Sequence, residues 1–226
     1  GRRSYRGVAA AFPDALLIPR SEWKDRIEEM ERTKTRLSDL VDAAGLLCHD
    51  QDGIGYCWIH APTHAMEIQQ VKQNEEIVLL SATSVGCKIK NFRDQGGWGK
   101  EGLEYIIEHG VVPQELWPEN QLKRQYDKVE SWEAAKDNIC TEWIFATPRD
   151  LDQTISLLLH RIPVAAGLNF WGHEVTYYDP IWKSNKVAVR FRNSWAMDWG
   201  DRGYGIIEGG KMPPDDAVSP LVKMAA

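Results

Sequence analysis

Cysteine is scarce in this sequence, and its spacing is irregular. The 226 residues include four cysteines, none in a CxxC pair: Cys48, Cys57, Cys87 and Cys140. Secreted domains that depend on disulfides carry cysteine at a much higher density. We therefore expect mostly free thiols and a cytoplasmic or otherwise reducing compartment. The chain also starts without a charged and then apolar leader, so no signal peptide is predicted.

Long apolar runs and an excess of positive charge are missing too. No segment approaches the roughly 20 apolar residues that span a bilayer, so we expect no membrane partner. Lys and Arg together number 27 against 33 Asp and Glu, which gives a net charge of -6. Surfaces that bind phosphate groups are basic, so nucleic acid is not expected as a partner.

The composition is sufficient for a large hydrophobic core. Hydrophobic residues make up 43% of the chain and aromatic residues 10%, which excludes a disordered chain. Apolar residues at helical spacing predict helices over 21–44, 57–73, 98–109 and 150–160. Short apolar runs predict strands over 141–147, 162–168, 172–178, 186–192 and 203–208. We therefore expect an α+β enzyme with a basic N-terminal arm (1–20), a helical lobe (21–140) and a β-rich lobe (141–226).

The most informative local motif runs from Gln51 to Trp58 and reads Gln-Asp-Gly-Ile-Gly-Tyr-Cys-Trp. Its two glycines allow a tight turn, after which Cys57 opens a predicted helix. A thiol at a helix N-terminus meets the positive end of the helix dipole, which lowers its pKa and favours the reactive thiolate. A lone cysteine, however, is more often a small buried hydrophobic residue.

Two distant segments supply the partners that such a thiolate needs. His173 begins a strand-like run that reads His-Glu-Val-Thr-Tyr-Tyr, and Asn193 follows the next run within Asn-Ser-Trp. The order Gln-x-Gly-x-Gly-x-Cys-Trp, then histidine, then Asn-Ser-Trp resembles the papain-like cysteine peptidases. Gln51 stands six residues before Cys57, as the pattern of that family requires, and the likeness covers most of residues 16–210.

The resemblance implies a catalytic role for four residues. Cys57 would attack the amide carbonyl as the nucleophile, and His173 would be its base and would then protonate the leaving amine. Asn193 would orient the imidazole of His173. Gln51 would donate its side-chain amide to the tetrahedral oxyanion, beside the backbone N–H of Cys57.

The resemblance also implies a fold and a substrate. It predicts a papain-like two-lobed fold, in which an active-site cleft separates a helical lobe from a β-barrel-like lobe. The partner would be a peptide or protein substrate, and neither a cofactor nor a metal is expected. Gly96 and Gly97 would line the cleft, where an extended substrate backbone can approach a chain without side chains. Trp58 and Trp195 would also lie beside the substrate, and Trp195 would shield the histidine–asparagine hydrogen bond from water.

The sequence departs from the family pattern in several places. Ile54 and Asp94 stand where the family usually has a pair of bridged cysteines, so that disulfide is not expected. The short gap between residues 168 and 173 trims the loop before the histidine and leaves the neighbouring substrate pockets undefined. Glu174 is expected on the opposite face of its strand from His173. No inhibitory prosegment is recognisable in residues 1–47.

Three alternatives stay open at this point. Cys57, His60 and His64 stand at i, i+3 and i+7 of one predicted helix, a spacing that could ligate zinc, although no fourth ligand is near in sequence. A cysteine amidase of the cell-wall hydrolase type would lack the Asn-Ser-Trp element. A catalytically silent papain-like module, acting as a structural or binding part of a larger assembly, would fit the basic arm and the trimmed cleft.

Overall fold

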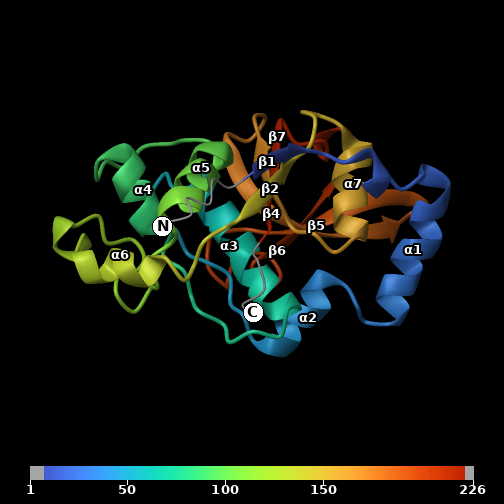
Figure 1. Cartoon of the computed structure of the whole chain (residues 1–226). Helices are drawn as coiled ribbons and strands as arrows, with labels where there is room; N and C mark the ends of the chain where they lie inside the picture. The colour runs from blue at the N-terminus through green and yellow to red at the C-terminus, as the bar shows by residue number, and fades with distance from the viewer. Residues whose placement is uncertain (1–7, 222–226) are drawn as a thin grey trace, which may run out of the picture.

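The computed structural model of the chain describes residues 8–221 (Figure 1). Within this range the α-helices are α1 (Arg20–Arg32), α2 (Leu37–Ala44), α3 (Cys57–Lys72), α4 (Ala82–Lys90), α5 (Gly99–His109), α6 (Val129–Ala135) and α7 (Leu151–Leu159). Short 3-10 helices occur at η1 (Asp14–Leu16), η2 (Arg124–Tyr126) and η3 (Gly209–Lys211). Figure 1 shows α4, α5 and α6 at one end of the molecule, α1 and α7 at the other, and α3 between them.

One mixed sheet provides the β structure. Its strands are β1 (Val8–Ala11), β2 (Glu142–Phe145), β3 (Val164–Leu168), β4 (His173–Lys183), β5 (Lys186–Arg192), β6 (Tyr204–Glu208) and β7 (Asp216–Leu221). They are ordered β1-β2-β7-β3-β4-β5-β6, and β1 and β2 form the parallel pair among antiparallel neighbours. The final residue of β3 pairs with His173, the first residue of β4. The tight connection between them therefore brings His173 to one end of the sheet.

Most of the predicted elements are confirmed. The helices predicted at 57–73, 98–109 and 150–160 correspond to α3, α5 and α7, and the five predicted strands correspond to β2 through β6. The Asp150 side chain caps α7 by accepting a hydrogen bond from the Gln153 N–H at 3.0 Å. The helical spacing of apolar residues and the short apolar runs therefore located these elements correctly.

The predicted helix over 21–44 is wrong in detail, because two helices share that segment. The chain breaks after α1, where Lys34 adopts a left-handed φ of 53°. The second helix starts because the buried carboxylate of Asp179, on β4, accepts hydrogen bonds from the backbone N–H groups of Leu37 (2.7 Å) and Ser38 (3.3 Å). A second cap is local, because the backbone N–H of Arg36 donates to Asp39 Oδ2 at 3.2 Å, but the contact with Asp179 is too distant in sequence to leave a local signal.

Two strands escaped prediction. β1 lies within the expected N-terminal arm and pairs with β2, and β7 inserts between β2 and β3 near the end of the chain. Neither has a strong strand pattern, since β1 reads Val-Ala-Ala-Ala and β7 contains Pro220. Residues 1–7 of the expected arm lie outside the described residues.

Separate hydrophobic clusters fill the two ends of the molecule. One cluster packs α1 and α7 against the sheet and includes Trp23, Ile155 and Tyr177. Another surrounds α3, α4 and α5 and includes Trp58 and Trp117. Helix α1 thus packs with the β-rich part, although the predicted division at residue 140 groups it with the helices. The division itself stays a prediction.

Helix α3 joins these two parts. Every residue from Trp58 to Gln70 is buried, and the helix contacts β3, β4 and β7 on one side and α4 and α5 on another. Pro62 lies inside it, where the ring removes one backbone hydrogen bond. Since both hydrophobic and polar side chains of this helix are buried, its polar residues must find partners inside the protein.

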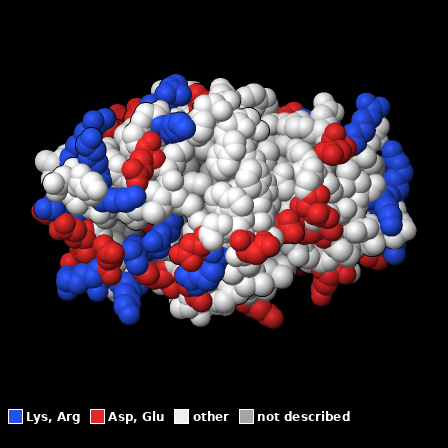
Figure 2. Space-filling model, turned by 180° about the vertical axis from the view of Figure 1, so that it is seen from behind, with Lys and Arg blue, Asp and Glu red and all other residues white. Residues whose placement is uncertain are grey.

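Charge is distributed unevenly over the face seen in Figure 2. A broad uncharged area occupies its middle, acidic side chains border that area, and lysines and arginines lie toward the two ends of the molecule. This face therefore does not present a continuous field of one sign. None of the described helices is long and apolar enough to cross a membrane.

Reductant should leave the melting temperature almost unchanged. All four cysteines are free, and Cys87 and Cys140 are fully buried among hydrophobic neighbours. Differential scanning calorimetry with and without dithiothreitol tests this expectation. A drop of many degrees would reveal a disulfide, which typically contributes about 2–4 kcal/mol, and would contradict our proposal of a reducing compartment.

Candidate active site

A short loop places Cys57 at the first position of α3. Left-handed backbone at Asp52 (φ 43°) and Gly53 (φ 76°) turns the chain. The backbone N–H of Gly55 then donates to Asp94 Oδ1 at 2.7 Å, and the Tyr56 hydroxyl donates to the Arg93 carbonyl at 2.8 Å. Hydrogen bonds thus join the two loops at the place where the family resemblance would put a disulfide.

His173 is held by Asn193 from the neighbouring strand segment. The two side chains are buried, and His173 Nε2 lies 2.7 Å from Asn193 Oδ1. The backbone N–H of Ser194 also donates to Oδ1, at 2.9 Å, which identifies this atom as the amide oxygen. His173 Nε2 must therefore carry the proton, which leaves Nδ1 with the lone pair that a base requires.

Aromatic rings enclose the imidazole. Trp195 stacks on His173 with ring centroids 4.6 Å apart. Trp171 meets the same imidazole edge-on at 4.9 Å and contacts Trp195 at 5.5 Å. Sequence reasoning missed Trp171, although its place two residues before the histidine was the available signal.

Gln51 is fixed by contacts to the segment that carries Asn193. The Ser194 hydroxyl donates to Gln51 Oε1 at 2.6 Å, and the Gln51 backbone N–H donates to the Ser194 carbonyl at 2.9 Å. One amide hydrogen of Gln51 goes to the Ile54 carbonyl at 2.6 Å. Since an amide group has two such hydrogens, one stays available to a ligand.

Cys57 and His173 meet at one pocket of about 190 Å³. Gly96, Gly97 and Trp58 line the same pocket. Trp58 is itself buried, with its indole N–H donating to the Gln95 carbonyl at 3.2 Å. The remaining predicted residues do not line this pocket: Asn193 and Trp195 contact its histidine, and Gln51 contacts Ser194, which stands between them in sequence.

Burial disfavours an isolated charge on either reactive residue. It raises the pKa of the Cys57 thiol, and this outweighs the backbone N–H groups of Glu174 and Trp58 that act in the opposite direction. Burial also lowers the pKa of His173, with opposition from its hydrogen bond to Asn193. The expectation that the helix start alone would lower the thiol pKa is therefore wrong.

Glu174 occupies an unexpected position. Its carboxylate turns toward the start of α5, where Oε2 accepts a hydrogen bond from the Gly99 N–H at 3.2 Å. Its backbone N–H nevertheless acts on the Cys57 sulfur, and Glu174 and His173 line the same pocket. The acidic residue Glu174 is therefore a neighbour of the reactive thiol.

Behind the pocket, α3 carries a buried polar network. Glu67 Oε2 lies 2.8 Å from His49 Nε2 and 3.0 Å from His64 Nδ1. His49 Nδ1 lies 3.0 Å from His60 Nδ1, and His64 Nε2 lies 2.7 Å from the Tyr178 hydroxyl. These five side chains form a continuous chain of polar contacts through the interior.

The zinc-type spacing noted in the sequence does not form a site. Cys57 faces the pocket, whereas the described groups with metal-ligand chemistry are His49, His60 and Glu119, and His49, His64 and Glu67. In the second group the carboxylate oxygen lies at hydrogen-bond distance from both nitrogens. Two ligands of tetrahedral zinc would stand about 3.3 Å apart, so these contacts fit proton sharing better than a metal.

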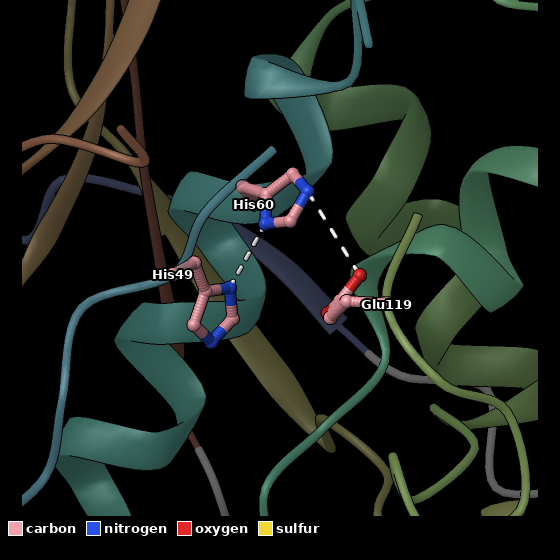
Figure 3. A group of neighbouring side chains, drawn as sticks. All are labelled: His49, His60 and Glu119. Atoms are coloured by element: carbon pink, nitrogen blue, oxygen red, sulfur yellow. Dashed lines mark hydrogen bonds and ion pairs between the residues drawn. The ribbon is translucent and has the colours of Figure 1, made fainter. Parts of the chain in front are cut away.

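The contact between His60 and Glu119, drawn in Figure 3, is longer than the contacts that Glu67 makes with its histidines. His60 Nε2 has no hydrogen-bond partner and lies 3.9 Å from Glu119 Oε2. The Glu119 carboxylate is already occupied, because it accepts hydrogen bonds from the backbone N–H groups of Ala82 and Thr83 at the start of α4. We therefore regard Glu119 as the cap of that helix.

Replacing Glu67 by glutamine should destabilise the protein strongly. Burial would raise the pKa of Glu67, but His49 and the hydrogen bonds hold it at about 2, below the ordinary value of 4.5. Loss of one partner of such a buried pair costs about 3–5 kcal/mol. Chemical denaturation at neutral pH measures the difference, with Glu133→Gln, in an exposed pair with Lys136, as the control.

The pH dependence of the same variant gives a second test. The contribution of Glu67 is present above pH 4.5 and is lost as the pH falls toward about 2. Burial would lower the pKa of His49, but the contact with Glu67 raises it above the ordinary value. The contribution of His49 to stability is therefore lost as the pH rises through this raised pKa. Glu67→Gln should flatten both slopes, and an unchanged pH profile would contradict the assigned pair.

Comparison with known proteins gives a consistent result. The family described as papain family cysteine protease matches residues 45–189. A cysteine protease of Ambrosia artemisiifolia is 24% identical over 177 residues, which cover 68% of this chain and 45% of that protein. Cathepsin S of Mus musculus is 26% identical over 220 residues, which cover 84% of this chain and 64% of that protein. The chain thus spans about half to two thirds of these relatives.

Solved structures agree on the fold. Procathepsin L 3 from the larval midgut of Tenebrio molitor superposes with a TM-score of 0.67 at 17% identity, covering 78% of this chain and 66% of that one. Xylellain, a cysteine protease from Xylella fastidiosa, gives a TM-score of 0.65 at 17% identity, covering 79% of this chain and 84% of that one. The expected α+β, two-lobed architecture is therefore confirmed.

Proposed function

Because this chain belongs to the papain family of cysteine proteases, we propose that it hydrolyses peptide bonds with Cys57 as nucleophile and His173 as base. One observation carries the proposal: the thiol and the imidazole line the same pocket. The 2.7 Å contact between His173 Nε2 and Asn193 Oδ1 supports it further, because it leaves Nδ1 free to take a proton.

The reaction would begin with proton transfer within the buried pair. The Cys57 thiol gives its proton to His173 Nδ1, so that a thiolate and an imidazolium form together. Burial opposes each charge by itself, whereas opposite charges on the two groups would stabilise one another. The Trp195 and Trp171 rings around the imidazole would keep water from weakening this attraction.

The thiolate would then attack the carbonyl carbon of the peptide bond. Negative charge develops on the carbonyl oxygen, where the free amide hydrogen of Gln51 and the backbone N–H of Cys57 would stabilise it. As the intermediate collapses, the carbon–nitrogen bond breaks and the leaving amine takes the proton from His173. Water then hydrolyses the thioester, with His173 again as base, and releases the acid product and the free thiol.

Removal of the nucleophile or of the oxyanion donor should affect turnover differently. Cys57→Ala should abolish hydrolysis, and Gln51→Ala should lower kcat by about two to three orders of magnitude. Turnover of a quenched fluorescent peptide library measures both, with Gln125→Ala, at an exposed position on η2, as the control. Activity of Cys57→Ala equal to the parent would contradict the assignment of the nucleophile.

The contribution of Asn193 can be separated from that of the surrounding rings. Asn193→Ala removes the acceptor for His173 and should lower kcat, with a change in stability of only about 1 kcal/mol. Asn193→Asp keeps an oxygen at this place and should retain more activity than Asn193→Ala. Trp195→Ala should lower both activity and stability, the latter by about 3 kcal/mol. Equal activity of the alanine and aspartate variants at position 193 would count against an orienting role.

The silent papain-like module is the alternative outcome. It would be favoured if the parent chain hydrolyses none of the library peptides and an epoxide or vinyl-sulfone reagent fails to label Cys57. Peptide mapping of the labelled chain decides this point, because Cys48, Cys87 and Cys140 are internal references for ordinary thiols.

A further inference from the structure

The pocket beside the thiol is shaped by missing side chains. Gly96, Gly97, Gly167 and Gly172 all line it, so much of its wall is backbone. Glu174 is the one carboxylate among the residues that line it. A side chain that enters this pocket therefore meets little steric resistance and a single acidic group.

Strand register places a second carboxylate next to the first. Gly167 on β3 pairs with Glu174 on β4 and, on its other side, with Asp216 on β7. Directly paired residues of neighbouring strands extend to the same face of a sheet. A Cβ on Gly167 would lie 3.3 Å from the Asp216 Cβ. The glycine thus leaves a gap in a row of three, with an acidic residue on each side.

Neither carboxylate is neutralised within the protein. The Glu174 side chain is 4% exposed, and its Oε1 atom is buried without a hydrogen-bond partner. Among the described residues, no lysine or arginine forms an ion pair with Glu174 or Asp216. Lys100, the cation that acts on Asp216, has a side chain that is 60% exposed.

The surroundings of Glu174 and Asp216 are unfavourable for two negative charges. Burial and the charge of Asp216 raise the pKa of Glu174 well above its ordinary range. Burial likewise raises the pKa of Asp216. A positive group between them would relieve both effects, because an opposite charge at close range favours the ionised carboxylate.

We propose that this pocket is an acidic specificity site that takes the lysine or arginine side chain of a peptide substrate. The cationic end approaches the acidic row of Glu174 and Asp216 at Gly167, the pocket residue that lies between them in the sheet. The aliphatic stem packs along Leu168 and along Trp98, whose side chain is 54% exposed at the pocket. The inference rests on the proposed peptidase function and names its substrate class.

Cleavage ratios test the preference directly. In a fluorogenic peptide library, each position around the cleaved bond is fixed in turn as arginine, lysine, leucine or glutamate. At one position, arginine and lysine should raise kcat/KM over leucine by about tenfold or more, since a charge-assisted hydrogen bond contributes about 1.5–3 kcal/mol. Glu174→Gln and Asp216→Asn should each reduce this ratio, and the double variant should bring it close to one.

The ratio separates recognition from chemistry, because both peptides use the same thiol and any change in its reactivity cancels. Glu208→Gln removes the acidic member, on β6, of a surface pair with Lys183 on β4 and should leave the ratio unchanged. If the thermal transition shows that Glu174→Gln does not fold, the Asp216→Asn variant alone provides the test of the acidic site. If the protein hydrolyses the peptides, two results overturn the inference and leave the peptidase function intact. The first is a kcat/KM ratio that favours arginine or lysine at no position, and the second is a ratio that stays unchanged in both variants.

A binding measurement covers the case in which no peptide is hydrolysed. The Cys57→Ala protein is titrated with fluorescent arginine and leucine peptides of the same sequence otherwise. Tighter binding of the arginine peptide that disappears in the Asp216→Asn background supports the acidic site even though the proposed hydrolysis fails. Equal binding of both peptides contradicts the site.

Discussion

The burial of helix α3 is the constraint on which the rest of the site depends. Its residues from Trp58 to Gln70 are enclosed between the sheet and the helices α4 and α5. A helix packed on several sides cannot rotate or slide without opening close-packed cores around it. Its first residue, Cys57, is therefore held at one pocket with His173 at the start of β4.

The same burial brings polar groups into the interior, where they must be matched. Glu67 accepts from two histidines and from the backbone N–H of Leu80, so that a fully buried carboxylate has three partners. A cavity of about 10 Å³ lies between this network and the catalytic residues, lined by His60, His64 and Asn193 among others. The network therefore supports the site from behind, and its balance of charge contributes to the stability of the helix that carries the thiol.

Features that depend on residues close together in the sequence were predictable, whereas features that depend on the packing of distant segments were not. The turn before Cys57, and the order of cysteine, histidine and Asn-Ser-Trp, are short-range patterns, and they identified the residues that meet at the pocket. The hydrogen bond from Gly55 to Asp94 and the alignment of Glu174 with Asp216 arise only when distant segments pack. Local patterns contain no information on such pairings, and for the same reason β1 and β7 were missed.

The pKa of the Cys57 thiol also could not be predicted from local sequence alone. Position at the helix start suggested a lowered pKa for Cys57, but burial, which only the folded chain reveals, acts more strongly in the opposite direction. Reactivity then depends on the partner imidazole rather than on the helix alone. His173 and its hydrogen bond to Asn193 are therefore decisive for the proposed chemistry.

The most direct measurement is the pH dependence of Cys57 alkylation by iodoacetamide in the parent chain and in His173→Ala, followed by mass spectrometry of each cysteine peptide. We expect Cys57 of the parent to react at pH values well below the ordinary thiol pKa of about 8.5, and His173→Ala to shift this profile to a pH above that value. Half-buried Cys48 is the internal reference in both proteins. Superimposable Cys57 profiles for the two proteins, or a Cys57 no faster than Cys48, would contradict the pairing of thiol and imidazole.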